Sequence, residues 1–255
     1  MKALITIINI ILLFSINSYA REVGETEITT EDGIEVFQNE KFYLLKKNVK
    51  IKSDNFTLNA NNVKIDFDDS LYDIIELNAE GNVDFYSQES EIRGNGKFLK
   101  FEIKIENLKI EGQGSKLIAK DVKMFSDGYI EVNNISGNFS LKGLNSKLVN
   151  DNIVIKAKSI DGVFFDLNDK KEITNLSVFD EEISYVKNKN TEMYANKINF
   201  NNQSSIIELI DNVIIIRDGE RITGDYGTLD TSNNSYKIKS NDQGKVKVII
   251  QSNEQ

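Results

Sequence analysis

The chain has 255 residues, a formal net charge of -9, and neither histidine nor cysteine. Without these two residue types it cannot form a Ser-His-Asp or Cys-His nucleophile, one of the usual zinc sites or a disulfide. Its excess of carboxylates also opposes binding to nucleic acid, because neutralising phosphates requires clustered Lys and Arg. Carboxylate pairs remain as candidate acid/base groups, but the 40 Asp and Glu are scattered between the expected strands and no pair stands out. We expect no catalytic residue, no metal, no cofactor and no nucleic-acid partner, and a protein that is not an enzyme.

Residues 1–20 have the pattern of a secretory signal peptide. Lys2 is followed by an apolar stretch over 3–14 and by the small-residue pattern Ser18-Tyr19-Ala20, after which a signal peptidase would cleave. The alternative is an uncleaved membrane anchor, although the stretch is shorter than the ~20 apolar residues that a membrane-spanning helix needs. We expect cleavage before Arg21 and export of the mature chain.

Along most of the remaining chain, apolar residues alternate with polar ones, which is the period of a half-buried β-strand. Clusters of turn-forming residues separate the alternating segments at 53–55, 68–70, 168–171 and 231–234. The pattern predicts an almost purely β protein. The alternating apolar positions are Val63, Ile65 and Phe67; Val83 and Phe85; Leu99, Phe101, Ile103 and Ile105; Val163, Phe165 and Leu167; Val213 and Ile215; and Val246, Val248 and Ile250.

The apolar positions change parity at two places. They are even-numbered from Phe56 to Ala60 and odd-numbered from Val63 onward, so a turn or bulge near Asn61-Asn62 must restore the inward face. The same change falls at Glu106-Asn107. We expect many short antiparallel strands between which the chain folds back often.

A degenerate repeat underlies this pattern. The segments "NVDFYSQESEIRGN" at 82–95 and "NVIIIRDGERITGD" at 212–225 both read as hairpins with the same spacing of apolar residues. Repetition of this kind indicates stacked supersecondary units that share one apolar interior. The repeat positions are Val49, Ile51, Leu58 and Ala60; Val83, Phe85, Ile92 and Gly94; and Val213, Ile215, Ile222 and Gly224.

The sequence shows no Pro-rich or Gly/Ser-rich linker. We expect a single domain over 21–250, followed by a frayed tail over 251–255. Residues 102–190 share the alternation but not the repeat, so they are either additional rungs or an insertion.

With these motifs the chain resembles the OstA-like β-jellyroll family, to which the lipopolysaccharide transport protein LptA belongs. The resemblance depends on the signal peptide, on "NAEGNVDFYSQESEIRGN" at 78–95 and on "DNVIIIRDGERITGDYGTLDTSNNSYKIKS" at 211–240. It implies an all-β, elongated and open β-jellyroll, or β-taco. It also implies a periplasmic protein that binds lipopolysaccharide for outer-membrane assembly, with the lipid A acyl chains inside the jellyroll and the sugars outside.

The resemblance further implies partners and a site. The partners would be an inner-membrane LptC-like jellyroll, an outer-membrane LptD-like jellyroll and other copies of the chain joined head to tail, and we place the free sheet edges near 28–37 and 236–250. Each candidate groove residue could equally be ordinary core. The candidates for the lipid-lined groove are Val49, Ile51, Leu58, Val63, Ile65, Val83, Phe85, Ile92, Val213, Ile215, Ile222 and Leu229.

Three other functions fit the same residues. One is a secreted structural or adhesive β-solenoid whose interior is closed and dry. The second is a β-helical enzyme acting on acidic polysaccharide, which would need carboxylates or basic residues converging on a cleft. The third is a membrane-anchored, LptC-like relative, which would retain residues 1–20.

Overall fold

The computed structural model describes residues 25–250 except 71–72, 89–90, 152, 168–169, 234 and 242–243. The expected signal peptide at 1–20 and the tail at 251–255 lie outside the described residues. The described part contains strands and turns but no helix, so no membrane-spanning helix was found in it. The expectation of an all-β protein is confirmed.

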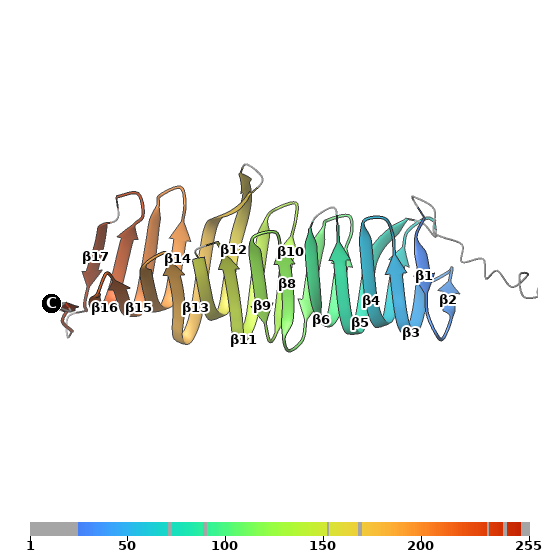
Figure 1. Ribbon diagram of the computed structural model, residues 1–255, viewed down its shortest axis with the longest axis horizontal. Helices are drawn as coiled ribbons and strands as arrows, with labels where there is room; N and C mark the ends of the chain where they lie inside the picture. Colours follow the sequence, from blue (N-terminus) through green and yellow to red (C-terminus); the bar gives the residue numbers. More distant parts are fainter. Residues whose placement is uncertain are drawn as a thin grey trace, which may run out of the picture.

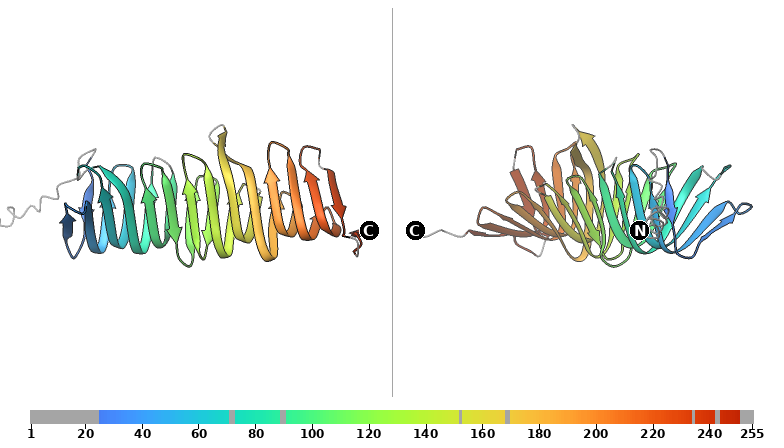
Figure 2. Two further views of the ribbon diagram at one scale, coloured as in Figure 1. Left: turned by 180° about the vertical axis from the view of Figure 1, so that it is seen from behind. Right: turned by 45° about the vertical axis from the view of Figure 1, so that its right-hand side comes forward.

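Eighteen strands in the described residues form one antiparallel sheet. They lie across the long axis of an elongated molecule and follow one another in chain order from one end to the other (Figures 1 and 2). The strands are β1 (Glu27–Thr29), β2 (Ile34–Phe37), β3 (Phe42–Lys52), β4 (Phe56–Phe67), β5 (Ile74–Ser87), β6 (Ile92–Glu102), β7 (Asn107–Glu111), β8 (Ser115–Ala119), β9 (Val122–Ser126), β10 (Tyr129–Asn133), β11 (Asn138–Asn150), β12 (Ile153–Leu167), β13 (Lys170–Asn188), β14 (Thr191–Asn201), β15 (Ile206–Arg217), β16 (Glu220–Asp230), β17 (Ser235–Lys239) and β18 (Lys247–Ile250).

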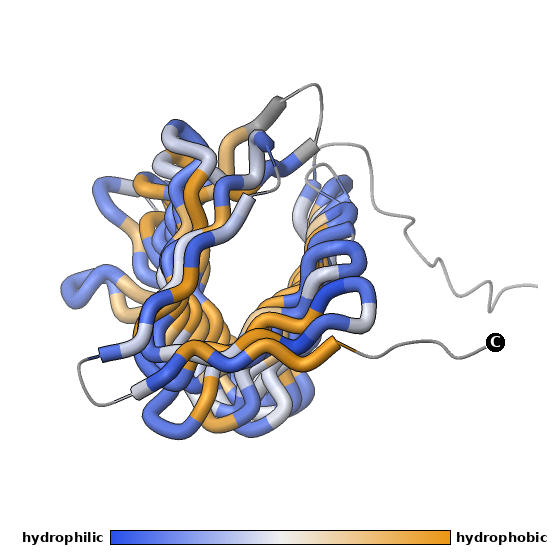
Figure 3. The backbone as a smooth tube through the Cα atoms, turned by 90° about the vertical axis from the view of Figure 1, so that its left-hand side faces the viewer, coloured by the Kyte–Doolittle hydropathy of each residue, from blue (hydrophilic) through white to orange (hydrophobic). Residues whose placement is uncertain are grey.

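The long strands bend near their middles, and the two halves of each strand lie in two different walls. In β3 the pairing with β4 is interrupted between Lys46 and Val49, and Lys47 and Asn48 at this point have φ of 66° and 53°. We call wall 1 the sheet half that contains β2, β7, β10 and β17, and wall 2 the half that contains β1, β8, β9 and β18. The walls meet at the bends and enclose a space that is seen end-on in Figure 3. The buried apolar residues of both walls form one core cluster.

The bends explain the asparagine that precedes each repeat valine. Asn48, Asn82 and Asn212 have φ of 53°, 51° and 55°, a left-handed conformation that Asn tolerates better than most residues. Two of them also donate a side-chain hydrogen bond to the bend of the preceding strand, from Asn82 to Asn61 at 3.2 Å and from Asn212 to Asn196 at 2.6 Å. The Asn-Val pair therefore marks the corner between the walls.

The two parity changes have different structural causes. The change at Asn61-Asn62 lies inside β4 and belongs to its bend, so it does not separate two strands. The short strands expected on either side of Asn61-Asn62 are therefore the two halves of one bent strand, β4. The change at Glu106-Asn107 is a true turn, because β6 ends at Glu102 and β7 starts at Asn107. The expected alternation through Ile103 and Ile105 is wrong for this reason: both lie in the turn, 37% and 51% exposed.

Two of the three repeats have the same strand register. Val49 faces Ala60 in the first copy, and Val213 faces Gly224 in the third. In the second copy Val83 faces Gly96, and Phe85 faces Gly94. This register differs because the β5–β6 turn is longer, so the repeat spacing found in the sequence does not translate into identical pairs.

Residues 107–188 continue the same stack. β6 pairs with β7 through one half and with β8 through the other, and β11 pairs in the same way with β10 and β9. Two rungs are therefore each built from two short strands, one in each wall. Within β12 a register shift after Val163 turns Phe164 inward and leaves Phe165 61% exposed, so the inward position expected for Phe165 is wrong. The division into domains stays a prediction.

Candidate functional site: an apolar cavity between the walls

A cavity of about 500 Å³ lies between the walls over β4 to β13. This volume is within the ~300–1,000 Å³ range of typical small-molecule pockets. Wall 1 supplies Leu77, Leu99, Phe101, Leu108, Val132 and Phe164, and wall 2 supplies Phe56, Phe85, Ile92, Leu117, Ala119, Val122 and Met124.

The lining points inward because side chains alternate along each strand half. Leu117 and Ala119 of β8 face the cavity, as do Val122 and Met124 of β9. On the other side of the strand, the Lys116 ammonium lies 5.7 Å from the centre of the Phe125 ring. The strands thus present one apolar face to the interior and a polar face to solvent.

Polar groups gather where the cavity reaches the hairpin turns. The side chain of Asn134 donates to Oε2 of Glu106 at 2.6 Å, and the side chain of Asn133 donates to the main-chain oxygen of Ile105 at 2.9 Å. Ser87 and Lys171 also line this part. An apolar interior with a polar rim suits an amphiphile whose apolar part enters and whose polar part stays at the mouth.

Beside the cavity a hydrogen bond joins the two walls across the mouth. Asn150, at the end of β11 in wall 2, is 7% exposed. Its side-chain nitrogen lies 3.4 Å from the main-chain oxygen of Lys171 in wall 1 and 3.5 Å from Oδ2 of Asp121. This bond links the two walls at the end of the cavity that Lys171 lines.

The structure places the twelve candidate groove residues in the interior. Phe85 and Ile92 line the cavity. Ile92 is partly buried, whereas the other eleven are at most 7% exposed and belong to the packed core. Contact between any of them and a lipid stays a prediction.

Sequence reasoning missed most of the cavity lining. Leu108, Leu117, Met124 and Val132 lie in the segment that lacks the repeat, and β7 to β10 are too short for a clear alternation. Phe56, Leu99 and Phe101 did stand out as alternating residues. The missing information was the pairing of β6 with both β7 and β8, which places these side chains in one space.

Among the described residues, no group of three or more carboxylates is arranged so that it could hold a metal ion.

Bent strands stacked around an apolar interior define an elongated, open β-jellyroll. Residues 30–137 match the family described as LptA/(LptD N-terminal domain) LPS transport protein, and the resemblance found in the sequence is confirmed. The fold is also similar to a crystal structure of LptH, the LptA homologous periplasmic component of the conserved lipopolysaccharide transport device from Pseudomonas aeruginosa. That similarity has a TM-score of 0.42 at 15% identity and covers 51% of this chain and 95% of LptH. No curated protein matches the chain.

Proposed function

We propose that this chain is a periplasmic carrier of lipopolysaccharide that shields acyl chains in its apolar interior. The observation that carries the proposal is the cavity of about 500 Å³ between the walls, with its polar rim. The family match over residues 30–137 supports the same function, which requires no catalytic residue.

The energetics favour such a shield. Each buried methylene contributes about 0.8 kcal/mol, so exposing an acyl chain of roughly a dozen carbons to water would cost on the order of 10 kcal/mol. A cavity lined by Leu, Phe, Val and Met removes most of this cost.

The free ends of the sheet support a bridging role. β1 and β2 both pair with β3 at one end, and β17 and β18 both pair with β16 at the other. Their outer edges can accept further strands. In this proposal residues 21–250 act as one domain after removal of 1–20, and the ends dock LptC-like and LptD-like jellyrolls or further copies of the chain.

Site-specific photocrosslinking tests the carrier function. We would replace Phe56 or Phe101, which line the cavity, with the photoreactive residue p-benzoylphenylalanine and irradiate the protein with lipopolysaccharide. The matched control carries the same residue at Tyr86, which is 45% exposed. Crosslinks from the two cavity positions but not from Tyr86 are the expected result.

Absence of crosslinks from both cavity positions, in proteins that remain folded and with lipopolysaccharide in excess, would overturn the proposal. The structural β-solenoid would then replace it, since a closed and dry interior accounts for the many core residues that are almost completely buried.

A further inference from the structure

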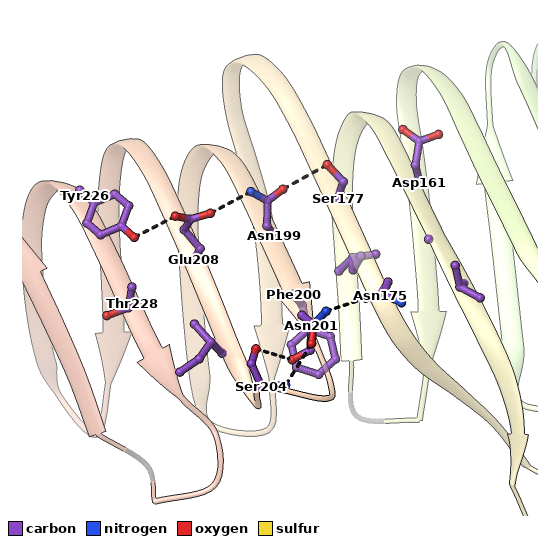
Figure 4. Close-up of a pocket in the computed structure, with 14 residues that line it drawn as sticks. Asp161, Asn175, Ser177, Asn199, Phe200, Asn201, Ser204, Glu208, Tyr226 and Thr228 are labelled. Atoms are coloured by element: carbon purple, nitrogen blue, oxygen red, sulfur yellow. Dashed lines mark hydrogen bonds between the residues drawn. The ribbon is translucent and has the colours of Figure 1, made fainter.

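A second hollow, of about 680 Å³, lies on the outer face of wall 1 across β12 to β16 (Figure 4). It is separate from the interior cavity, although β12 contributes to both. Val163 lines the outer hollow, and the next residue, Phe164, lines the cavity on the other face. We call this hollow the outer groove.

A chain of hydrogen bonds crosses four strands of the outer groove. The Tyr226 hydroxyl donates to Oε1 of Glu208 at 2.8 Å, and the Asn199 side chain donates to Oε2 of Glu208 at 3.1 Å. Ser177 continues the chain by donating to Oδ1 of Asn199 at 3.2 Å (Figure 4). The bonds from Tyr226 and Asn199 lower the pKa of Glu208 below its usual value, so Glu208 is an ionised acceptor at neutral pH.

A second row lies closer to the mouth. The Asn201 side chain donates to Oδ1 of Asn175 at 3.1 Å, and the main-chain nitrogen of Ser204 donates to Oδ1 of Asn201 at 3.0 Å. Both Asn175 and Asn201 are exposed. Their amide groups keep donor and acceptor capacity beyond these single bonds, since each amide offers two donors and an acceptor with two lone pairs.

The other end of wall 1 has a different outer face. There Lys100 forms ion pairs with Glu76 at 3.1 Å and with Glu102 at 3.2 Å, and Lys109 pairs with Glu111. The Lys100–Glu76 pair is an ordinary cross-strand contact, and the other two pairs join residues two positions apart on one face of a strand. Amides and hydroxyls predominate across β13 to β16, and the charged side chain that lines the β12 end of the outer groove, Asp161, forms an ion pair with Lys142.

These groups match the chemistry of a saccharide. Sugar hydroxyls both donate and accept hydrogen bonds, as do the Asn amides and the Ser, Thr and Tyr hydroxyls of the outer groove. Adjacent strands lie about 4.8 Å apart, comparable to the size of one sugar ring. Val163, Ile206 and the Tyr226 ring add apolar surface against which the C–H face of a sugar can pack, and other β folds bind oligosaccharides across a strand face.

We propose that the outer groove binds the uncharged sugar units of an oligosaccharide laid across β13 to β16. Asn175, Asn199, Asn201 and Glu208 form hydrogen bonds to its hydroxyls. The Asn201–Ser204 end lies at the β14–β15 turn, on the mouth side of wall 1, so a saccharide attached to a lipid in the interior could extend over this turn into the outer groove. The occupant can thus be the sugar part of a lipid or a free glycan, and this first source depends on the proposed carrier function.

Titration of the folded chain with lipid-free sugars tests the proposal. The probes are the polysaccharide released from lipopolysaccharide by mild acid and, as a free glycan, chitotetraose. The readouts are the affinity by calorimetry and the side-chain amide signals of Asn175, Asn199 and Asn201 by NMR. We expect one of the two probes to bind and to shift these signals. Binding of the released polysaccharide identifies a lipid-attached source, and binding of chitotetraose alone identifies a free glycan.

Asn199→Ala should weaken the binding about fivefold to tenfold, as expected from the loss of one or two net hydrogen bonds. The matched control is Asn78→Ala, which removes an Asn bonded to Glu76 on the same outer face but outside the outer groove. The proposal fails if neither probe binds, if binding leaves the three amide signals unmoved, or if the control weakens it equally. Because the probes contain no acyl chain, this failure is distinct from a failure of the carrier function.

Discussion

Phe85 faces Gly94 directly across the β5–β6 pair, and its ring occupies the space that a side chain at Gly94 would need. A Cβ at Gly94 would lie 2.3 Å from the Phe85 ring and 2.7 Å from Cδ1 of Ile110. Packing therefore explains why the second repeat ends in a glycine. The Phe85 ring fills the space that a side chain at position 94 would occupy.

Gly94→Ala should destabilise the fold by about 1–3 kcal/mol, because an added methyl group in a filled core forces neighbouring side chains to move. Denaturant unfolding of the folded domain measures the change. Asn95→Ala, at the adjacent exposed position, serves as the control and should stay within about 0.5 kcal/mol. Equal stabilities of the two variants would show that the ring can move at no cost.

Asn212→Val should cost about 1–3 kcal/mol, since Asn212 has φ of 55° and a β-branched residue is strained in this region. Asn212→Gly should cost much less, because glycine adopts positive φ freely. Thermal unfolding of both variants distinguishes the backbone effect from the loss of the hydrogen bond to Asn196, which both substitutions remove. A Gly variant as unstable as the Val variant would assign the effect to that bond.

Ala119→Phe should lower the affinity for a fluorescent long-chain fatty acid by at least about tenfold, which corresponds to about 1.4 kcal/mol of binding free energy. The reason is that the ring would occupy part of the cavity that Ala119 lines. Ile118→Phe is the matched control, since residue 118 is on the opposite side of the same strand. Binding titrations at equal protein concentration give both affinities. The cavity is not the acyl site if the two variants bind alike.

Loss of the Glu208 carboxylate should change how stability depends on pH. The pKa of Glu208 is lowered in the folded state from an ordinary 4.5 by hydrogen bonds from Tyr226 and Asn199. Its contribution to stability is therefore fully present above pH 4.5 and is lost as the pH falls through the lowered folded-state value. Glu208→Gln should be less stable than the parent at pH 7, and the difference should shrink below pH 4.5 in thermal melts. A difference independent of pH would contradict this account.

Charges on the C-terminal edge strand should prevent end-to-end assembly. Val248 and Ile250 of β18 are 52% and 69% exposed, so Val248→Asp with Ile250→Asp should leave the monomer folded while repelling an added strand. Sedimentation velocity over a range of concentrations measures the assembly. Ile105→Asp with Ile135→Asp, two exposed apolar residues in turns, is the control. Unchanged assembly of the β18 variant would exclude this edge as the docking surface.

The period-two alternation was enough to predict the all-β fold and the inward position of residues such as Val63 and Ile215, because the neighbours along one regular strand determine which face a side chain occupies. It failed at Phe165, where a register shift within β12 exchanges the two faces.

The bends could not be predicted as bends. The parity change at Asn61-Asn62 is the same for a turn that reverses the chain and for a bend within one strand. Only the pairing of β4 with its neighbours on both sides of these residues distinguishes a bend from a turn. The cavity depends on contacts between residues far apart in the sequence, such as Phe56 of β4 with Phe85 of the neighbouring β5 at 6.4 Å between ring centres, which no local pattern specifies.

The arrangement of strands across the long axis has a mechanical consequence. A pull along that axis loads the rungs in series, while the hydrogen bonds of any one rung share the force. The stack then yields first at its least-paired rung, which is the N-terminal one: β1 pairs three residues with β3 and β2 pairs four, whereas β9 and β10 each pair four residues with β11. Under tension a terminal strand would peel away first and the interior rungs would remain closed, so a broken junction could form again without refolding the molecule.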